Sequence, residues 1–277
     1  MQPSVLITGV TSGIGRAAAM RFAEMGFRVI GTGRSSRHAR SLQHRLDELP
    51  SCVSGQHRIM LCDQSSLGTV RRLAQTIAAE GSSLHAVVAN AGIQPRMRSV
   101  TPDGIESTIG VNHLAHFVLV RELAPMLRES SGRVVVTSSS SHTDGLLEDD
   151  DLELVRGWTP EGAYGRSKRA NIMFAAEVRE RLGLPGSAFH PGDIRTAINR
   201  DSIVAKLTKP LEYVKYAPPS RGVETLEWLV TSDEGAAPSA VYYAECAPAQ
   251  PHSDVFDERK RDWLWSESTR LIDRVLS

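Results

Sequence analysis

Tyr164 and Lys168 have the residue types and the spacing needed for acid–base chemistry. They are four residues apart in a stretch predicted to be helical to about Leu182, so their side chains would share one face, about 6 Å apart along the axis. A nearby ammonium group stabilises a phenolate, which in water forms only at about pH 10. The pair could therefore donate or accept a proton, although the same spacing also occurs on solvated helix faces.

A glycine-rich segment at residues 9–15 follows a short apolar run, residues 5–8, and precedes a helical pattern that ends near Gly26. Glycines in this context can bind a dinucleotide, because the turn lets a phosphate approach the backbone and the helix N-terminus offers free N–H groups. An ordinary strand-to-helix turn is the alternative. We favour dinucleotide binding.

The second predicted strand, residues 28–32, is followed by Gly33 and Arg34, with Arg37 and Arg40 close behind. An acidic residue in this vicinity would bind the adenosine ribose of NAD, and it would repel the 2′-phosphate of NADP. A guanidinium group instead forms charge-assisted hydrogen bonds with a phosphate. The arginines therefore favour NADP(H) over NAD(H), although they could also simply solvate the helix predicted at residues 36–49.

Predicted strands and helices alternate along the chain. The further strands are predicted at residues 57–62, 84–88, 132–137, 187–190 and 240–244, and the further helices at 67–79, 104–127, 164–182, 223–230 and 257–276. The alternation predicts an α/β fold: one Rossmann-type, doubly wound domain over residues 1–277, with seven mainly parallel strands and helices on both faces. Ligands of such sheets bind at the carboxyl ends of the strands, where the glycine turn, Asn90 and Ser139 all fall.

The composition limits the classes of partner. Lys plus Arg and Asp plus Glu number 32 each, so the formal net charge of +0 gives no reason to expect a nucleic acid. The 3 cysteines are widely spaced and argue for reduced thiols. The acidic stretch at residues 148–153 lacks the spacing of a calcium loop. We expect a cytoplasmic protein with no metal site and no membrane span.

Residues 195–221 have no clear periodicity and contain three prolines, Pro210, Pro218 and Pro219. Long unpatterned segments in compact domains are usually functional, and this one is predicted to close over a substrate as a lid. The helix predicted at residues 257–276 carries Trp263 and Trp265 at helical spacing. We interpret these tryptophans as core or interface residues.

Together the motifs resemble those of the short-chain dehydrogenase/reductase family, over nearly the whole chain. They are, in chain order, Thr8-Gly9-x-x-x-Gly13-Ile14-Gly15, Asp63, Asn90-Ala91-Gly92, Asn112, Ser139, Tyr164-x-x-x-Lys168 and Pro191-Gly192. The long gap from Ser139 to Tyr164 and the tail Tyr242-Tyr243-x-x-Cys246 are similar to the retinol-dehydrogenase-like and protochlorophyllide-reductase-like branch. Ala89 and Asp193 depart from the family pattern, which often has Asn at the first position and an apolar residue at the second.

The resemblance implies a catalytic set of Asn112, Ser139, Tyr164 and Lys168. Tyr164 would act as the general acid or base on the substrate oxygen, and Ser139 would stabilise the charge that builds there. Lys168 would lower the pKa of Tyr164 and hydrogen-bond the nicotinamide ribose, and Asn112 would hold a water in a proton relay ending at Lys168. Because residues 138–141 are all serine, the position of the catalytic serine is ambiguous by one residue, and the family pattern favours Ser139.

The resemblance also implies NADP(H) as the cofactor. Its binding positions correspond to the catalytic pair together with Gly9, Ser12, Gly13, Ile14, Gly15, Arg34, Asp63, Asn90, Gly92, Pro191, Gly192 and Thr196. The residues from Ser12 onward in the glycine turn would line the pyrophosphate, Arg34 the 2′-phosphate and Asp63 the adenine. Asn90 and Gly92 would support the two riboses, and the segment from Pro191 to Thr196 the nicotinamide carboxamide.

The predicted function is that of an NADP(H)-dependent oxidoreductase that interconverts a carbonyl and a secondary alcohol on a small-to-medium, largely apolar substrate. One alternative keeps the fold and cofactor but performs non-redox chemistry, as a cyclase, epimerase or dehydratase. A less favoured alternative is a cofactor-sensing binding protein, because all four catalytic positions are intact. The resemblance further implies a homodimer or homotetramer.

Overall fold

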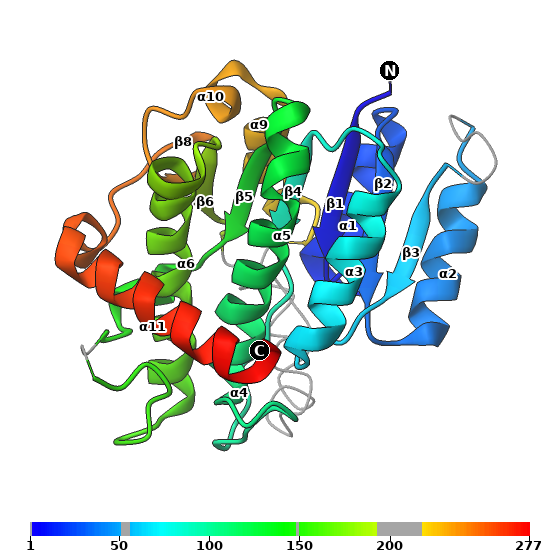
Figure 1. Cartoon of the computed structure of the whole chain (residues 1–277). Helices are drawn as coiled ribbons and strands as arrows, with labels where there is room; N and C mark the ends of the chain where they lie inside the picture. The colour runs from blue at the N-terminus through cyan, green and yellow to red at the C-terminus, as the bar shows by residue number, and fades with distance from the viewer. Residues whose placement is uncertain (1, 51–55, 148–149, 193–217) are drawn as a thin grey trace.

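The computed structural model describes residues 2–50, 56–147, 150–192 and 218–277 (Figure 1). Their strands form one eight-stranded sheet in the order β3-β2-β1-β4-β5-β6-β7-β8. The strands are β1 (Ser4–Thr8), β2 (Arg28–Gly33), β3 (Arg58–Leu61), β4 (Ala86–Ala89), β5 (Arg133–Thr137), β6 (Gly186–His190), β7 (Tyr242–Ala244) and β8 (Ala247–Pro248). The pairs from β3 to β7 are parallel, and β8 runs antiparallel to β7.

The predicted α/β architecture is confirmed, but the predicted count of seven strands is wrong by one. β8 is only two residues long and includes Pro248, so it has no alternating pattern that a sequence could reveal. β1, by contrast, is buried along its whole length. Parallel strands covered by helices on both faces are continuous apolar runs, which made the central strands easy to predict.

Helices cover both faces of the sheet. They are α1 (Gly13–Glu24), α2 (Ser36–Asp47), α3 (Leu67–Ala79), α4 (Ser107–Ile109), α5 (Ala115–Glu129), α6 (Pro160–Leu182), α9 (Glu224–Thr231), α10 (Asp233–Ala236) and α11 (Glu258–Leu276). The apolar side chains of α3, α5, α6 and α11 form one core cluster, and those of α1, α2 and α9 form the other. In Figure 1, α11 crosses the front of α6 and α5 and ends near α3. The fold is therefore doubly wound, as predicted.

The helix that carries the Tyr164–Lys168 pair begins one turn earlier than predicted. Thr159 caps α6, because its side chain accepts a hydrogen bond from the Gly162 N–H at 3.0 Å, and Pro160 occupies the first turn. Gly183 ends the helix with φ 63°, a left-handed conformation that glycine adopts without strain. Tyr164 and Lys168 thus lie inside a regular helix, where their relative positions are fixed.

The helix predicted at residues 104–127 is interrupted. α4 is followed by the π-helix η1 (Gly110–Leu114), in which the Ala115 N–H bonds to the Gly110 carbonyl five residues earlier, and then by α5. π-Turns of this kind are frequent at functional sites. Asn112 lies in η1, so the interruption falls at a residue of the predicted catalytic set.

The predicted lid falls outside the described residues up to residue 217, and so do Thr196 and Asp193. The lid and the extent of the domain stay predictions. Within the ranges that are described, no helix combines the length and the apolar character needed to cross a bilayer.

Candidate active site

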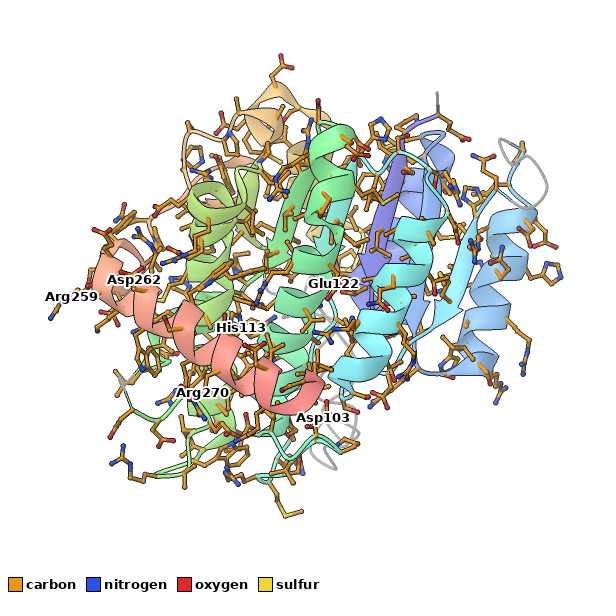
Figure 2. All side chains as sticks on the ribbon, viewed as in Figure 1. Asp103, His113, Glu122, Arg259, Asp262 and Arg270 are labelled. Carbon is orange, nitrogen blue, oxygen red and sulfur yellow. The ribbon has the colours of Figure 1, made fainter. Side chains whose placement is uncertain are left out.

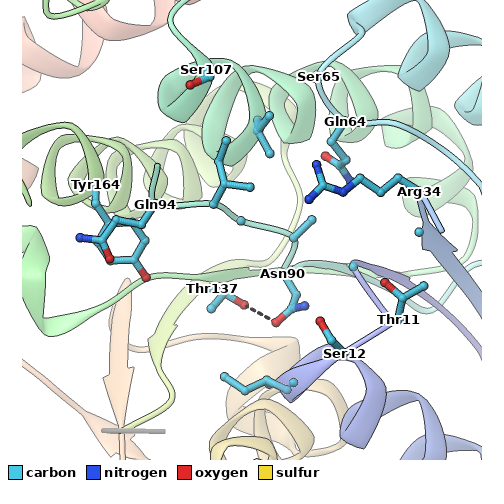
Figure 3. A pocket seen from close by; sticks show the side chains of 18 of the residues that line it. Thr11, Ser12, Arg34, Gln64, Ser65, Asn90, Gln94, Ser107, Thr137 and Tyr164 are labelled. Atoms are coloured by element: carbon cyan, nitrogen blue, oxygen red, sulfur yellow. Dashed lines mark hydrogen bonds between the residues drawn. The ribbon is translucent and has the colours of Figure 1, made fainter. Parts of the chain in front are cut away.

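One cavity of about 950 Å³ runs along the carboxyl edge of the sheet (Figure 3). Its lining includes the turn after β1, the ends of β2, β4, β5 and β6, and the start of α6. Among the predicted residues, it contains Gly9, Ser12, Gly13, Ile14, Arg34, Asp63, Asn90, Gly92, Ser139, Tyr164, Lys168, Pro191 and Gly192. Gly15 and Asn112 are buried and do not belong to the lining. The predicted site residues therefore converge on a single cavity of the size that large ligands occupy.

The backbone of the glycine turn has the geometry of a phosphate-binding loop. A Cβ on Gly15 would lie 2.5 Å from the Gly9 carbonyl oxygen and 2.6 Å from the Asn90 Nδ2, so only glycine fits where the turn meets the end of β4. Gly9 has φ +75° and Gly13 has φ +57°, which favour glycine at both positions. α1 begins at Gly13, and its N-terminal N–H groups lie at the cavity. These residues fit the pyrophosphate of a dinucleotide.

Arg34 is the arginine of the predicted cluster that reaches the cavity. It is exposed, it follows β2, and it lines the cavity together with Ser35 and His38. Figure 3 shows its guanidinium group beside Gln64, at the end of the lining opposite Tyr164. Arg37 is also exposed but does not belong to the lining. A phosphate at this end of the cavity would therefore meet Arg34.

Ser139 and Ser138 have different surroundings, which bears on the ambiguous register. The Ser138 side chain is buried and donates to the Lys168 carbonyl at 2.9 Å. Ser139 is partly exposed and caps the 3₁₀-helix η2 (Ser140–Thr143). Its side chain also forms a hydrogen bond with Tyr164, and this bond lowers the Tyr164 pKa. Both serines line the cavity, but the geometry favours Ser139 as the partner of the phenol.

Lys168 lies beside Tyr164 in the structure. The Lys168 Nζ lies 5.3 Å from the centre of the Tyr164 ring and donates to the Thr137 carbonyl at 3.1 Å. Burial raises the pKa of Tyr164 to about 12, against the smaller lowering by Ser139. Burial also lowers the pKa of Lys168 to about 8. In this geometry, desolvation of the phenol outweighs its hydrogen bond to Ser139, and a lowering of the Tyr164 pKa by Lys168 stays a prediction.

Asn112 holds the loop that follows β4. Its Oδ1 accepts from the Ile93 N–H at 2.8 Å, and its Nδ2 donates to the Ile93 carbonyl at 3.0 Å and to the Ser167 Oγ at 3.0 Å. A Cβ on Gly92 would lie 3.4 Å from the Asn112 Oδ1 and 3.6 Å from the Lys168 Nζ. Asn112 therefore connects the loop after β4 with α6, the helix that carries Tyr164 and Lys168.

Arg169 is a residue of the site region that the sequence did not indicate. It is fully buried and donates to the carbonyls of His142 at 2.9 Å and Thr143 at 2.8 Å, and it pairs with Asp254 at 2.6 Å. These bonds hold η2, the turn that follows Ser139. Its partners are distant in sequence, so no local pattern could have revealed the role.

Two buried histidines are expected to make the stability of the fold sensitive to acid. Burial lowers the pKa of His113 to about 4 and that of His116 to about 3, below the ordinary value of 6.5. As pH falls below 6.5, these histidines therefore bind protons in the unfolded chain but not in the folded protein. Each histidine then lowers the free energy of unfolding by about 1.4 kcal/mol for every pH unit.

Between pH 7 and pH 5, we expect wild type to lose about 2 kcal/mol more unfolding free energy than His113→Gln, in which one titrating group is absent. Urea unfolding at both pH values measures the difference. Parallel losses in the two proteins would show that His113 is not held neutral.

Residues 3–205 match the short chain dehydrogenase family. The chain belongs to this family. The short-chain dehydrogenase is 33% identical to human retinol dehydrogenase 14, over 97% of its own length and 86% of the relative. It is also 33% identical to a Streptomyces sp. (strain C5) protein assigned as a daunorubicin C-13 ketoreductase, over 97% of its own length and 92% of that protein.

Solved structures show the same architecture. An Escherichia coli CFT073 protein assigned to the short chain dehydrogenases, in complex with NADPH, superposes with a TM-score of 0.65 at 28% identity, covering 84% of this chain and 92% of the other. The predicted resemblance to the family and to its retinol-dehydrogenase-like branch is confirmed. The short-chain dehydrogenase is thus an enzyme of an oxidoreductase family.

Proposed function

We propose that this short-chain dehydrogenase uses NADP(H) to interconvert a carbonyl compound and a secondary alcohol of small-to-medium, largely apolar structure. The observation that carries the proposal is the placement of Arg34 and Tyr164 at opposite ends of one cavity that the glycine turn also lines. A phosphate-binding end and an acid–base end would hold the two reactants of a transfer reaction side by side. The ketoreductase and retinol dehydrogenase relatives and the NADPH-bound neighbour support this assignment.

Some cavity residues would bind the reactants, and others would transfer the proton. NADPH, when bound, would supply the hydride. Tyr164 and Ser139 would hydrogen-bond the carbonyl oxygen and stabilise the negative charge that develops on it. Because the pKa of Tyr164 is about 12, its phenol carries the proton at neutral pH and can donate it to that oxygen. In this protonation state the phenol is ready to act as the acid of the reduction step.

Lys168 and Asn112 would prepare the acid. The Lys168 Nζ is buried, bonded to the Thr137 carbonyl and 5.3 Å from the centre of the Tyr164 ring, and it would replace the lost proton through the solvent of the cavity. Asn112 would keep Gly92 and Ile93 against Lys168 through its bonds to Ile93. The cytoplasmic location and the homo-oligomeric state stay predictions.

Consumption of NADPH with a panel of apolar aldehydes and ketones tests the function. We expect loss of NADPH absorbance in step with alcohol formation, and less activity with NADH. A compound that is converted with no loss of NADPH would instead favour the non-redox alternative. A protein that binds NADPH but converts nothing in the panel would favour the cofactor-sensing alternative.

A further inference from the structure

His116 lies between the nucleotide-binding turn and the catalytic helix region, although it does not line the cavity. It is fully buried at the start of α5. Its Nε2 is 2.9 Å from the Thr8 Oγ1, and its Nδ1 is 3.0 Å from the Asn112 carbonyl oxygen. One ring thus bridges the end of β1 and the π-turn η1.

The contacts of the ring determine its tautomer. A carbonyl oxygen can only accept, so the proton must be on Nδ1, which donates to Asn112. Burial lowers the pKa of His116 to about 3, so the ring is neutral and Nε2 is an acceptor. The Thr8 hydroxyl must therefore donate to Nε2, in preference to the more distant Val88 carbonyl at 3.4 Å.

The orientation of the Thr8 hydroxyl determines what it can accept. Its oxygen accepts from the backbone N–H groups of Asn90 at 2.8 Å and Ala91 at 2.9 Å. With one proton donated and two hydrogen bonds accepted, the hydroxyl is saturated. Both amides belong to the loop that follows β4 and lines the cavity. His116 therefore fixes the Thr8 proton in the one direction that leaves both lone pairs for this loop.

The same loop is held at its other end by Asn112, whose side chain bonds both the N–H and the carbonyl of Ile93 and also donates to the Ser167 Oγ of α6 at 3.0 Å. Asn112 sits in a π-turn, where the backbone hydrogen bonds are displaced by one residue. The bond from the His116 Nδ1 to the Asn112 carbonyl fixes this residue in place. Residues 90–93 are thus held at both ends by groups that His116 contacts.

We propose that His116 is a positioning residue that couples the two halves of the site: its Nε2 sets the cofactor side through Thr8, and its Nδ1 sets the catalytic side through Asn112. Only the expected effect on turnover rests on the proposed function. The coupling between the two sides depends on the hydrogen bonds that join Thr8, His116 and Asn112. Two substitutions separate the halves, because Asn can mimic Nδ1 and Gln can mimic Nε2.

His116→Asn should keep a donor near the Asn112 carbonyl and lose the contact with Thr8. We expect its NADPH dissociation constant to rise by about tenfold, with kcat at saturating NADPH within about threefold of wild type. His116→Gln should do the reverse, lowering kcat by about tenfold with little change in NADPH binding. Fluorescence titration with NADPH and steady-state kinetics measure the two constants.

His113 provides the matched control. It is also fully buried, three residues earlier, but its Nε2 is 3.0 Å from the Ser268 Oγ of α11, and Figure 2 shows it between α5 and α11. We expect His113→Asn and His113→Gln to lower the melting temperature while leaving both constants within about twofold. If the His116 variants change both constants together, in proportion to their loss of melting temperature as a purely structural residue would, the coupling is overturned.

Ring ¹⁵N NMR of wild type tests the assigned hydrogen bonds without any substitution or turnover. We expect a His116 ring that stays neutral from pH 8 to about pH 5, with its proton on Nδ1. A proton on Nε2 would overturn the proposal, because Thr8 would then have to accept from the ring. If wild type reduced no carbonyl compound, the proposed function would be wrong. The NADPH titration and the tautomer seen by NMR would still test the role of His116.

Discussion

Tyr164→Phe should lower kcat by about 10²–10⁴-fold, the range for loss of a positioned general acid. The substitution removes only the hydroxyl group, which hydrogen-bonds Ser139 and faces the cavity. The remaining ring keeps its place in α6, so the NADPH dissociation constant should stay within about twofold. Steady-state kinetics with the best carbonyl substrate, together with a fluorescence titration of NADPH, measure both quantities.

Tyr243→Phe is the control for this loss. Its hydroxyl donates to Glu234 at 2.5 Å and accepts from the Ala240 N–H at 2.9 Å, away from the cavity. The control should lose some stability and keep its turnover. Equal kcat values for Tyr164→Phe and wild type would contradict the role of the phenol, and a large loss of NADPH binding would show that the ring serves the cofactor instead.

Arg34→Ala should raise the NADPH dissociation constant by about 10–100-fold, because each hydrogen bond from a guanidinium to a phosphate contributes about 1.5–3 kcal/mol. The dissociation constant for NADH, which has no 2′-phosphate, should change by less than about twofold. The effect should weaken as salt is added, because Arg34 is exposed.

Arg37→Ala is the matched control, since Arg37 carries the same charge three residues further on but lies outside the cavity lining. Its NADPH affinity should stay close to that of wild type. Equal losses in the two variants would mean that the positive charge of the segment, rather than Arg34 itself, attracts the phosphate. Equal losses for NADPH and NADH in Arg34→Ala would mean that Arg34 does not distinguish the two cofactors.

Local patterns in the sequence predicted most of the fold. The helix predicted at residues 67–79 has the bounds of α3, whose apolar residues recur at helical spacing; in the structure the Ser66 side chain caps it by accepting from the Thr69 N–H. The central strands are short apolar runs between glycine and polar turns. The sequence could not reveal β8, which is too short for a pattern, or the π-turn at Asn112, where a shift of one residue in backbone hydrogen bonding leaves the apolar spacing nearly unchanged.

The sequence predicted the members of the site better than their electrostatics. Motifs identified Ser139, Tyr164 and Lys168, which line one cavity. The burial that raises the Tyr164 pKa could not be predicted, because no motif encodes how deeply a side chain is buried. The support from His116 and Arg169 was also missed, since it depends on contacts with Thr8 and Asp254, far away in the sequence.

Transfer of deuterium from NADPH tests the central claim most directly. The short-chain dehydrogenase would be incubated with a carbonyl compound and NADPH deuterated at the transferred position of the nicotinamide, and the alcohol would be analysed by mass spectrometry. The account predicts one deuterium per alcohol molecule, on the former carbonyl carbon, at a rate that Tyr164→Phe reduces together with NADPH consumption. Product formed without deuterium on that carbon, or with NADPH left intact, would contradict hydride transfer as the reaction of this site.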